Sequence, residues 1–474
     1  MNFQVPSGPS RDKEENQLLY YAFLCLIVWA PLPLGSNRQW AWSLLEIITF
    51  CIFSAWLIGF IRQSVKTPPL LKTLKLPLIL LASWLLFMLL QAVPYPVTLL
   101  KYLSLSTYET FAYTTENLKY APLSLDQGAT VDEFLKCSSY VIIFFLTIIL
   151  VTTRKRLKTL AYTIVIVGAV EAAYGLLNTL SGVEYVWWMP KEYYKGYVTG
   201  TFINRNHFAG YLEMVIPVGI GLLMASQKKL KYFPNWQSKV RHVVTFILEA
   251  RGRLLLYIML MFSAIFLTAS RGGVVALFVA LTLLFLVTLF VRGLKNQELR
   301  FLLFMLAVAL VAGLWLGLGD LPDRYSAADS QLAGRTSIWE PALALFGDYL
   351  YFGTGAGTFP YVFPLYQDSS QGGYYSHAHN DYLELLGDYG LVGSVLLVTP
   401  IVILLFKILK GYIKRHDPLM RGMLFASLTG TLAMLIHATI DFNFHIPANS
   451  LYFYVLLGMG IVATTLRENR RSVI

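Results

Sequence analysis

Charged residues are scarce in this chain of 474 residues. Asp, Glu, Lys and Arg together make up 14%, whereas apolar residues make up 56%. A soluble domain carries roughly 25% charged residues, so the composition predicts a polytopic membrane protein. Lys and Arg outnumber Asp and Glu by 38 to 27, but the basic residues stand in short segments between apolar runs. Membrane topology and contact with anionic lipids explain this charge, and nucleic-acid binding is not expected.

Cysteine is also scarce, and several nucleotide-binding signatures are missing. The three cysteines have no spacing pattern, which argues against a disulfide framework and a zinc-cysteine site. The chain has neither a Gly-x-x-x-x-Gly-Lys-Ser/Thr loop nor a dinucleotide fingerprint. The first apolar run ends in Pro31-Leu-Pro-Leu-Gly35 rather than in a small-residue cleavage site, so we expect an uncleaved first span.

The apolar runs predict an all-α bundle of about twelve transmembrane helices, forming a single integral membrane domain over residues 1–474. A helix needs about 20 apolar residues to cross the hydrocarbon layer. The expected spans are 17–34, 40–61, 76–93, 134–153, 159–181, 207–226, 254–270, 272–291, 301–319, 389–409, 423–441 and 450–466. The seventh and eighth form the least secure pair, because only Arg271-Gly-Gly273 separates them.

The distribution of basic residues predicts the orientation. With both termini in the cytoplasm, 28 of the 38 Lys and Arg residues lie inside and 10 lie outside. Basic segments stay in the cytoplasm, so this orientation is preferred. It places residues 320–388 in a large periplasmic loop between the ninth and tenth spans. In this loop, 337–346 could form an amphipathic helix at the membrane surface, and 353–357 is expected to be a flexible glycine-rich turn.

Four ionisable residues fall within spans, at the midpoint of the span or on its periplasmic side: Glu46, Glu171, Glu213 and His437. Such residues are costly in a membrane and usually mark a pathway or a site. Their placement suggests a polar cavity that opens towards the outer leaflet. The alternative is that they hold helices together by hydrogen bonds.

Three arginines stand in glycine- or asparagine-flanked outer segments, where the topology rule disfavours them: Arg205, Arg271 and Arg335. A guanidinium group binds phosphate oxygens in a bidentate manner and stays charged. If several guanidinium groups lie at one point, they would bind a diphosphate and stabilise the negative charge that develops on it as the leaving group. The alternative is that each arginine reaches lipid headgroups.

A histidine-rich segment gives the clearest sequence signal for a catalytic site. His377 and His379 are followed by Asn380, Asp381 and Glu384. A neutral imidazole is a competent general base for a hydroxyl acceptor. A His-x-His pair with a nearby carboxylate can also ligate zinc, but no third ligand has a diagnostic spacing, so we expect no metal. A structural role, capping the tenth helix or bonding loop carbonyls, is the other alternative.

With these motifs the chain resembles the O-antigen ligase and polysaccharide polymerase superfamily of bacterial envelope proteins. The resemblance is carried by segments 31–38, 200–209, 270–271, 334–335 with Trp339, 377–383, 390–393 and 441–449. It implies metal-independent, cofactor-independent glycosyl transfer from an undecaprenyl diphosphate-linked glycan. The implied acceptor is the lipid A-core in a ligase, or another lipid-linked glycan in a polymerase.

The resemblance also implies roles for individual residues. The two functional arginines of the family match Arg271 and Arg335, which would hold the donor diphosphate. The functional histidine matches His377 or His379, and His379 is favoured because it directly precedes Asn380. In-line attack would invert the anomeric carbon. Additional candidates for binding donor or acceptor are Arg38, Arg205, Asn206 and Asn380.

The expected location is the bacterial inner membrane, with the active face in the periplasm and contacts to membrane lipids. A ligase is slightly preferred to an O-antigen or exopolysaccharide polymerase, which shares the chemistry. A transporter is the alternative from another class. It is disfavoured because the ionisable residues lie towards the outer face, whereas transporters bind substrates near the midplane.

Overall fold

The computed structural model describes residues 11–63, 65, 67–226, 249–292, 337–367 and 374–466. Within these ranges the chain is almost entirely helical, and ten helices are long and apolar enough to cross a membrane. They are α2 (Gln39–Ile61), α3 (Lys75–Ala92, extended at its start by the 3-10 turn η2, Pro69–Leu74), α6 (Gln127–Leu150), α7 (Arg154–Leu180), α8 (Arg205–Ala225), α10 (Ala250–Leu267), α11 (Arg271–Arg292), α16 (Asp381–Lys414), α17 (Pro418–His437) and α18 (Pro447–Thr465). The prediction of an all-α polytopic membrane protein is confirmed.

Each of these ten helices overlaps one of the twelve expected spans. The first expected span corresponds to α1 (Arg11–Trp29), whose apolar part, Gln17–Trp29, is shorter than a full span. The ninth, 301–319, lies outside the described residues. The seventh and eighth spans are two separate helices, α10 and α11, joined by the tight turn 268–270. The total of twelve stays a prediction.

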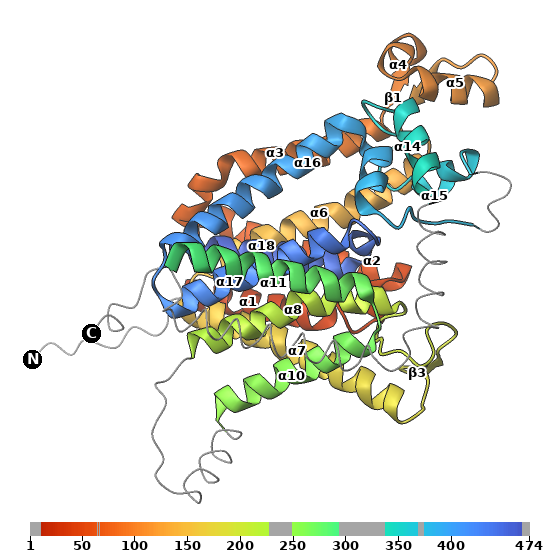
Figure 1. The fold of residues 1–474 in the computed structure, drawn as a ribbon. Helices are drawn as coiled ribbons and strands as arrows, with labels where there is room; N and C mark the ends of the chain where they lie inside the picture. Colours follow the sequence, from red (N-terminus) through yellow and green to blue (C-terminus); the bar gives the residue numbers. More distant parts are fainter. Residues whose placement is uncertain are drawn as a thin grey trace, which may run out of the picture.

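Helices α8, α17 and α18 are the most buried of these ten helices, and α17 and α18 run through the middle of the bundle in Figure 1. α8 and α17 cross at Gly221 and Gly422, and a Cβ at either glycine would collide with the backbone oxygen of the other. Close backbone approach through small residues is how helices pack in a membrane, where lipid gives them no hydrophobic drive to associate. This crossing fixes the position of the segments that follow α17 relative to the start of α8.

The short elements gather at one end of the bundle (Figure 1). They are η1 (Leu34–Ser36), the paired strands β1 (Pro94–Pro96) and β2 (Tyr120–Pro122), α4 (Val97–Leu103), α5 (Leu105–Thr114), the paired strands β3 (Tyr185–Val186) and β4 (Met189–Pro190), α14 (Trp339–Asp348), α15 (Phe359–Val362), η3 (Phe363–Leu365) and η4 (Asn443–His445). At the other end Arg154 pairs with Asp417 at 2.6 Å. The segments expected in the periplasm and those expected in the cytoplasm are thus separated, although which end faces the cytoplasm stays a prediction.

The tenth expected span begins earlier than its apolar run. α16 starts at Asp381 rather than at residue 389, because the Asn380 side chain caps it by accepting hydrogen bonds from the backbone N–H groups of Tyr382 and Leu383. Gly390 interrupts the helix with φ 60° and ψ −168°, a conformation that only glycine adopts readily. The carboxylates of residues 381–388 therefore belong to a helix, not to the loop 320–388.

α14 confirms the helix expected near 337–346. The prediction that 353–357 is a flexible turn is wrong. This turn is buried, and its backbone is tied to α16 through hydrogen bonds to Gly387 and Asp388. The Gln91 side chain of α3 donates to the carbonyls of Phe352 and Asp388, at 2.7 and 3.0 Å, and accepts from Ala356 N–H at 3.2 Å. One amide thus joins α3, the turn and α16.

Candidate functional site

The histidine segment is held in place by the first turn of α16. Glu384 points back along the chain, so that its Oε2 accepts a hydrogen bond from the backbone N–H of Ala378 at 3.1 Å. Its Oε1 lies 2.8 Å from Nδ1 of His377. Glu384 is almost fully buried, whereas the His377 side chain is about one-fifth exposed. The carboxylate therefore orients an imidazole that remains accessible from one side.

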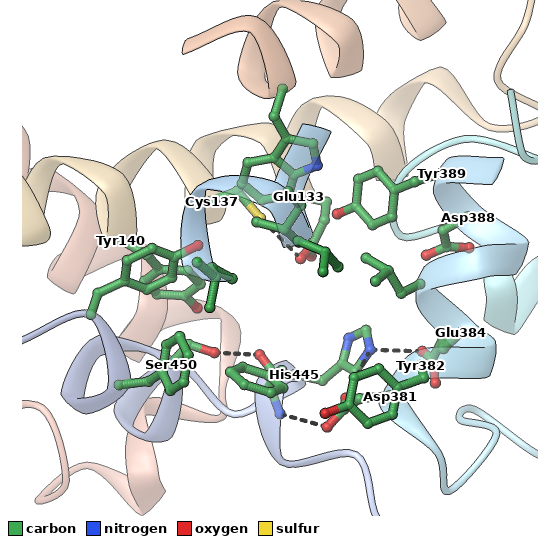
Figure 2. A pocket seen from close by; sticks show the side chains of 18 of the residues that line it. Glu133, Cys137, Tyr140, Asp381, Tyr382, Glu384, Asp388, Tyr389, His445 and Ser450 are labelled. Atoms are coloured by element: carbon green, nitrogen blue, oxygen red, sulfur yellow. Dashed lines mark hydrogen bonds and ion pairs between the residues drawn. The ribbon is translucent and has the colours of Figure 1, made fainter. Parts of the chain in front are cut away.

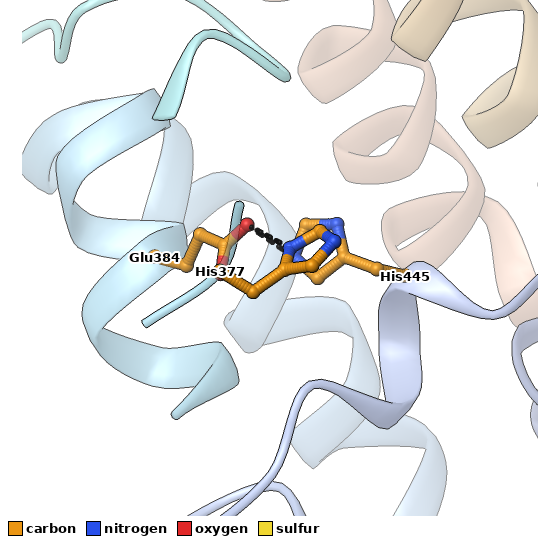
Figure 3. Close-up of side chains that lie close together, drawn as sticks. All are labelled: His377, Glu384 and His445. Carbon is orange, nitrogen blue, oxygen red and sulfur yellow. Dashed lines mark hydrogen bonds and ion pairs between the residues drawn. The ribbon is translucent and has the colours of Figure 1, made fainter. Parts of the chain in front are cut away.

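A second segment, the connection between α17 and α18, completes this cluster with a histidine that the sequence analysis did not select. His445 Nε2 lies 3.1 Å from Oε1 of Glu384 (Figure 3). It also lies 3.6 Å from Oδ1 of Asp381. The backbone N–H of Phe444 donates to Oδ2 of Asp381 at 3.1 Å. Burial lowers the pKa of the His445 imidazole, and this effect exceeds the raising effect of the nearby Glu384 carboxylate.

The buried carboxylate of Asp441, which was not a predicted site residue, contacts two of the predicted site segments. Its Oδ1 is 3.9 Å from Nδ1 of His379 and 3.7 Å from Nε2 of His207, and its Oδ2 accepts a hydrogen bond from Asn206 at 2.8 Å. Asn206 and His207 stand in the first turn of α8, which Asn204 caps. Residues 204–207, 377–384 and 441–445, far apart in the chain, thus meet at one point.

The ring of Phe442 contacts three of these imidazoles. It stacks on His377 with centroids 4.2 Å apart, and it meets the rings of His207 and His379 edge-on at 4.6 and 5.0 Å. Packing against this phenyl ring orients the three imidazole rings without occupying their nitrogen atoms. The nitrogens therefore remain available for polar partners.

The backbone of His379 is held in an unusual conformation, with φ 49°. A non-glycine residue at positive φ costs of order 1 kcal/mol and persists only where the surroundings over-determine it. Here the Asn380 cap follows directly and Ala378 is pinned by Glu384. The His379 side chain is 29% exposed, so the strained backbone presents its imidazole at the surface of the cluster.

Three of the four predicted arginines lie in described segments. Arg271 is the first residue of α11, and the next residue, Gly272, packs against His437 and Ile440, just before Asp441. The guanidinium of Arg205 lies over the ring of Tyr197, with 4.1 Å to the centroid. The exposed Arg38 stands immediately before α2. Arg335 lies outside the described residues.

Three of the four ionisable residues predicted within spans have polar partners, as the alternative of helix-holding hydrogen bonds supposed, whereas Oε1 of Glu46 is buried and makes no hydrogen bond among the described residues. Glu171 of α7 accepts hydrogen bonds from the backbone and the hydroxyl of Thr201. Glu213 of α8 lies 3.2 Å from Nδ1 of His437 at the end of α17. Neither pair lines the cavity described next, and both fix the helices that carry the site.

A cavity of about 120 Å³ opens beside the cluster, with mostly apolar walls. It is enclosed by α3, α6, α16, α17 and α18, with Trp84 and Phe453 among its apolar walls and Glu133, Glu384 and His445 among its polar ones (Figure 2). This is not the polar cavity expected around Glu46, Glu171, Glu213 and His437: none of the four lines it, and its carboxylates come from α6 and α16.

Comparison with known protein families gives one match. Residues 256–398 match the O-antigen ligase family. This range covers Arg271, Arg335, His377 and His379, whereas Asp441 and His445 lie beyond it. No curated protein matches the chain. The family match over residues 256–398 supports the resemblance to the O-antigen ligase superfamily, and the ten apolar helices indicate a multi-pass membrane protein.

Proposed function

We propose that the protein is an O-antigen ligase that moves a glycan from undecaprenyl diphosphate to a hydroxyl of the lipid A-core. The O-antigen ligase match supports the reaction class. The reaction would take place at the periplasmic face of the bacterial inner membrane. This location follows from the charge distribution along the chain, which puts the segments of the site outside.

The observation that carries the proposal is the pairing of His379 with the buried Asp441. The carboxylate faces Nδ1 of the imidazole at 3.9 Å, which leaves Nε2 to accept a proton from the acceptor hydroxyl. This is the arrangement of a general base oriented by a third group, and such contacts often tighten only when substrate binds. His377 is the alternative base, because Glu384 faces its Nδ1 in the same way at 2.8 Å; His379 is preferred because it directly precedes Asn380, as the family resemblance implies.

The reaction balances with the groups at hand. The acceptor oxygen forms a bond to the anomeric carbon while its proton passes to His379, and the bond from that carbon to the diphosphate breaks with inversion. Arg271 and Arg335 would bind the diphosphate and stabilise the charge on the leaving group. Arg38, Arg205, Asn206 and Asn380 remain secondary candidates for contacts with donor or acceptor. The transfer needs no ATP, since the diphosphate linkage is already activated, and the family resemblance implies that it needs no metal.

The apolar cavity next to the cluster also supports a lipid-linked substrate. Its walls include Leu397, Ile401 and Phe453, and it ends at carboxylates of α16. Such a surface suits the junction between a lipid chain and a hydroxyl-bearing head.

A polymerase that adds the glycan to another lipid-linked glycan is the alternative, because only the acceptor differs. The test is a transfer assay in nanodiscs with EDTA, which supplies undecaprenyl diphosphate-linked glycan and lipid A-core. Glycosylated core from the wild type, and none from His379→Ala, is the expected result. Longer lipid-linked glycans without core product would identify a polymerase, and no transfer to either acceptor by folded protein would favour transport.

The matched control is His416→Ala. This exposed histidine precedes α17 at the opposite end of the bundle, so its loss should leave the transfer rate unchanged. A similar loss of activity in both variants would mean that the assay reports general damage, not the role of the base.

A further inference from the structure

Two imidazoles and a carboxylate from separate segments converge beside the proposed base. Nδ1 of His377, a carboxylate oxygen of Glu384 and Nε2 of His445 all lie within 4.8 Å of one another (Figure 3). Around a tetrahedral zinc ion with bonds of about 2.0–2.1 Å, neighbouring ligand atoms are about 3.4 Å apart. The distances from Glu384 Oε1 to the two ring nitrogens, 2.8 and 3.1 Å, are already close to that value.

The carboxylates of this cluster are oriented in the same way. Glu384 has its Oε2 held by the backbone N–H of Ala378, and Asp381 has its Oδ2 held by the backbone N–H of Phe444. Their other oxygens both face Nε2 of His445, at 3.1 and 3.6 Å. Metal ligands are commonly oriented by such outer hydrogen bonds to the atoms that do not bind the ion.

One polar atom in this arrangement lacks a partner. Oδ1 of Asp381 is buried and makes no hydrogen bond among the described residues, although its side chain is only 6% exposed. A buried acceptor without a partner is costly, and such an atom calls for an unseen ligand. Asp381 would thus supply a fourth oxygen, or bind through a water molecule.

The charge of the cluster favours a divalent cation. Asp381 and Glu384 place two carboxylates in a buried space with two imidazoles. Lys136 of α6, which also faces His445, is engaged with Glu133 at 3.3 Å and brings no net charge as a pair. A bound dication would neutralise both carboxylates, which hydrogen bonds from neutral imidazoles cannot do.

We propose that His377, Glu384 and His445 form a binding site for one divalent transition-metal ion of the zinc class. The expectation of no metal depended on spacing within the histidine segment, and the third ligand comes from a residue 61 positions beyond Glu384. The ion would connect the segment before α16 to the connection between α17 and α18. It takes no part in the transfer chemistry proposed above, so metal binding and transfer are tested separately.

The experiment is a titration of the purified full-length protein with Zn²⁺, after removal of metal with a chelator and without a histidine tag. Isothermal calorimetry should give one ion per chain. His445→Ala and Glu384→Gln should each weaken binding by about tenfold or more. Zinc-edge X-ray absorption should report two imidazole ligands for the wild type.

The neighbouring His379 provides the sharpest control. If metal binds simply to the His-x-His pair, His379→Ala should weaken binding as much as His445→Ala does; our proposal expects His379→Ala to bind nearly as the wild type. Gel filtration and thermal melting without metal will show whether each variant is folded, and Glu384→Gln replaces His445→Ala if the latter is not. Absence of stoichiometric binding by the folded wild type would overturn the proposal and leave the cluster as a hydrogen-bond network.

Discussion

The carboxylate of Asp441 should control the rate of transfer without controlling the binding of the donor. Asp441→Asn keeps the shape of the side chain and can still accept the hydrogen bond from Asn206. It removes the negative charge that faces Nδ1 of His379, and it can present an amide N–H there instead. When His379 takes the proton of the acceptor, the resulting imidazolium therefore loses its counter-charge.

The size of this effect follows from the 3.9 Å separation of Asp441 Oδ1 and His379 Nδ1. Two unit charges at this distance interact by about 1 kcal/mol in water and about 4 kcal/mol at an effective dielectric constant of 20. Asp441 is buried but His379 is 29% exposed, so an intermediate value of about 2 kcal/mol is appropriate. Because each 1.36 kcal/mol is a factor of ten, kcat should fall about 30-fold.

Single-turnover transfer in nanodiscs, at saturating donor, measures this change directly. Asp132→Asn is the charge-matched control, because Asp132 is an exposed residue of α6 and its loss should leave kcat unaltered. Asp441→Asn should cost little more in a His379→Ala background, since both changes remove the same interaction. A kcat within threefold of wild type, or full additivity of the two losses, would refute the assignment of Asp441 as the residue that orients the base.

Three further outcomes are expected. Gly422→Ala should lower the free energy of unfolding by about 2 kcal/mol or more, measured by thermal melting, because the new methyl group collides with the backbone of Gly221. Gly390→Ala should reduce both the melting temperature and transfer, since alanine disfavours the positive φ that turns α16 there. Arg271→Lys should reduce the transfer rate at least tenfold if its guanidinium binds two diphosphate oxygens, because lysine offers only a point charge.

Two of these changes have a matched control. Gly347→Ala in α14 introduces a methyl group with no atom within 4 Å, so it should be neutral or slightly stabilising. If Gly422→Ala behaves likewise, the helix crossing is looser than described. Arg62→Lys, at an exposed position after α2, should keep full activity. Full activity of Arg271→Lys as well would exclude a bidentate clamp at that position.

The spans were predictable because the length of an apolar run is a local property of the chain. The start of α16 was missed, since residues 381–388 are too polar to extend an apolar run and the Gly390 break interrupts the helix. The Asn380 cap followed by Asp381 and Glu384 was the available signal for an earlier start. Local capping, rather than hydropathy, decides where this helix begins.

The centre of the site depends on contacts between segments far apart in the chain. His377 and His379 could be selected from their own segment, but the partners Asp441 and His445 lie about 60 residues further on, and no spacing rule connects them. A signal was nevertheless present. Histidine occurs only seven times, and five of the seven fall in outer segments or in the outer halves of expected spans: His207, His377, His379, His437 and His445.

The three hydrogen bonds of the Gln91 side chain have a mechanical consequence. They couple α3 and α16, which both line the cavity, to the turn 353–357 behind them, so we expect these parts to move as a single body. Separating them would break bonds worth about 1 kcal/mol each and leave a buried amide unsatisfied. Widening of the cavity must therefore come from displacing this whole body against α17 and α18, and a long lipid-linked chain would enter along that boundary.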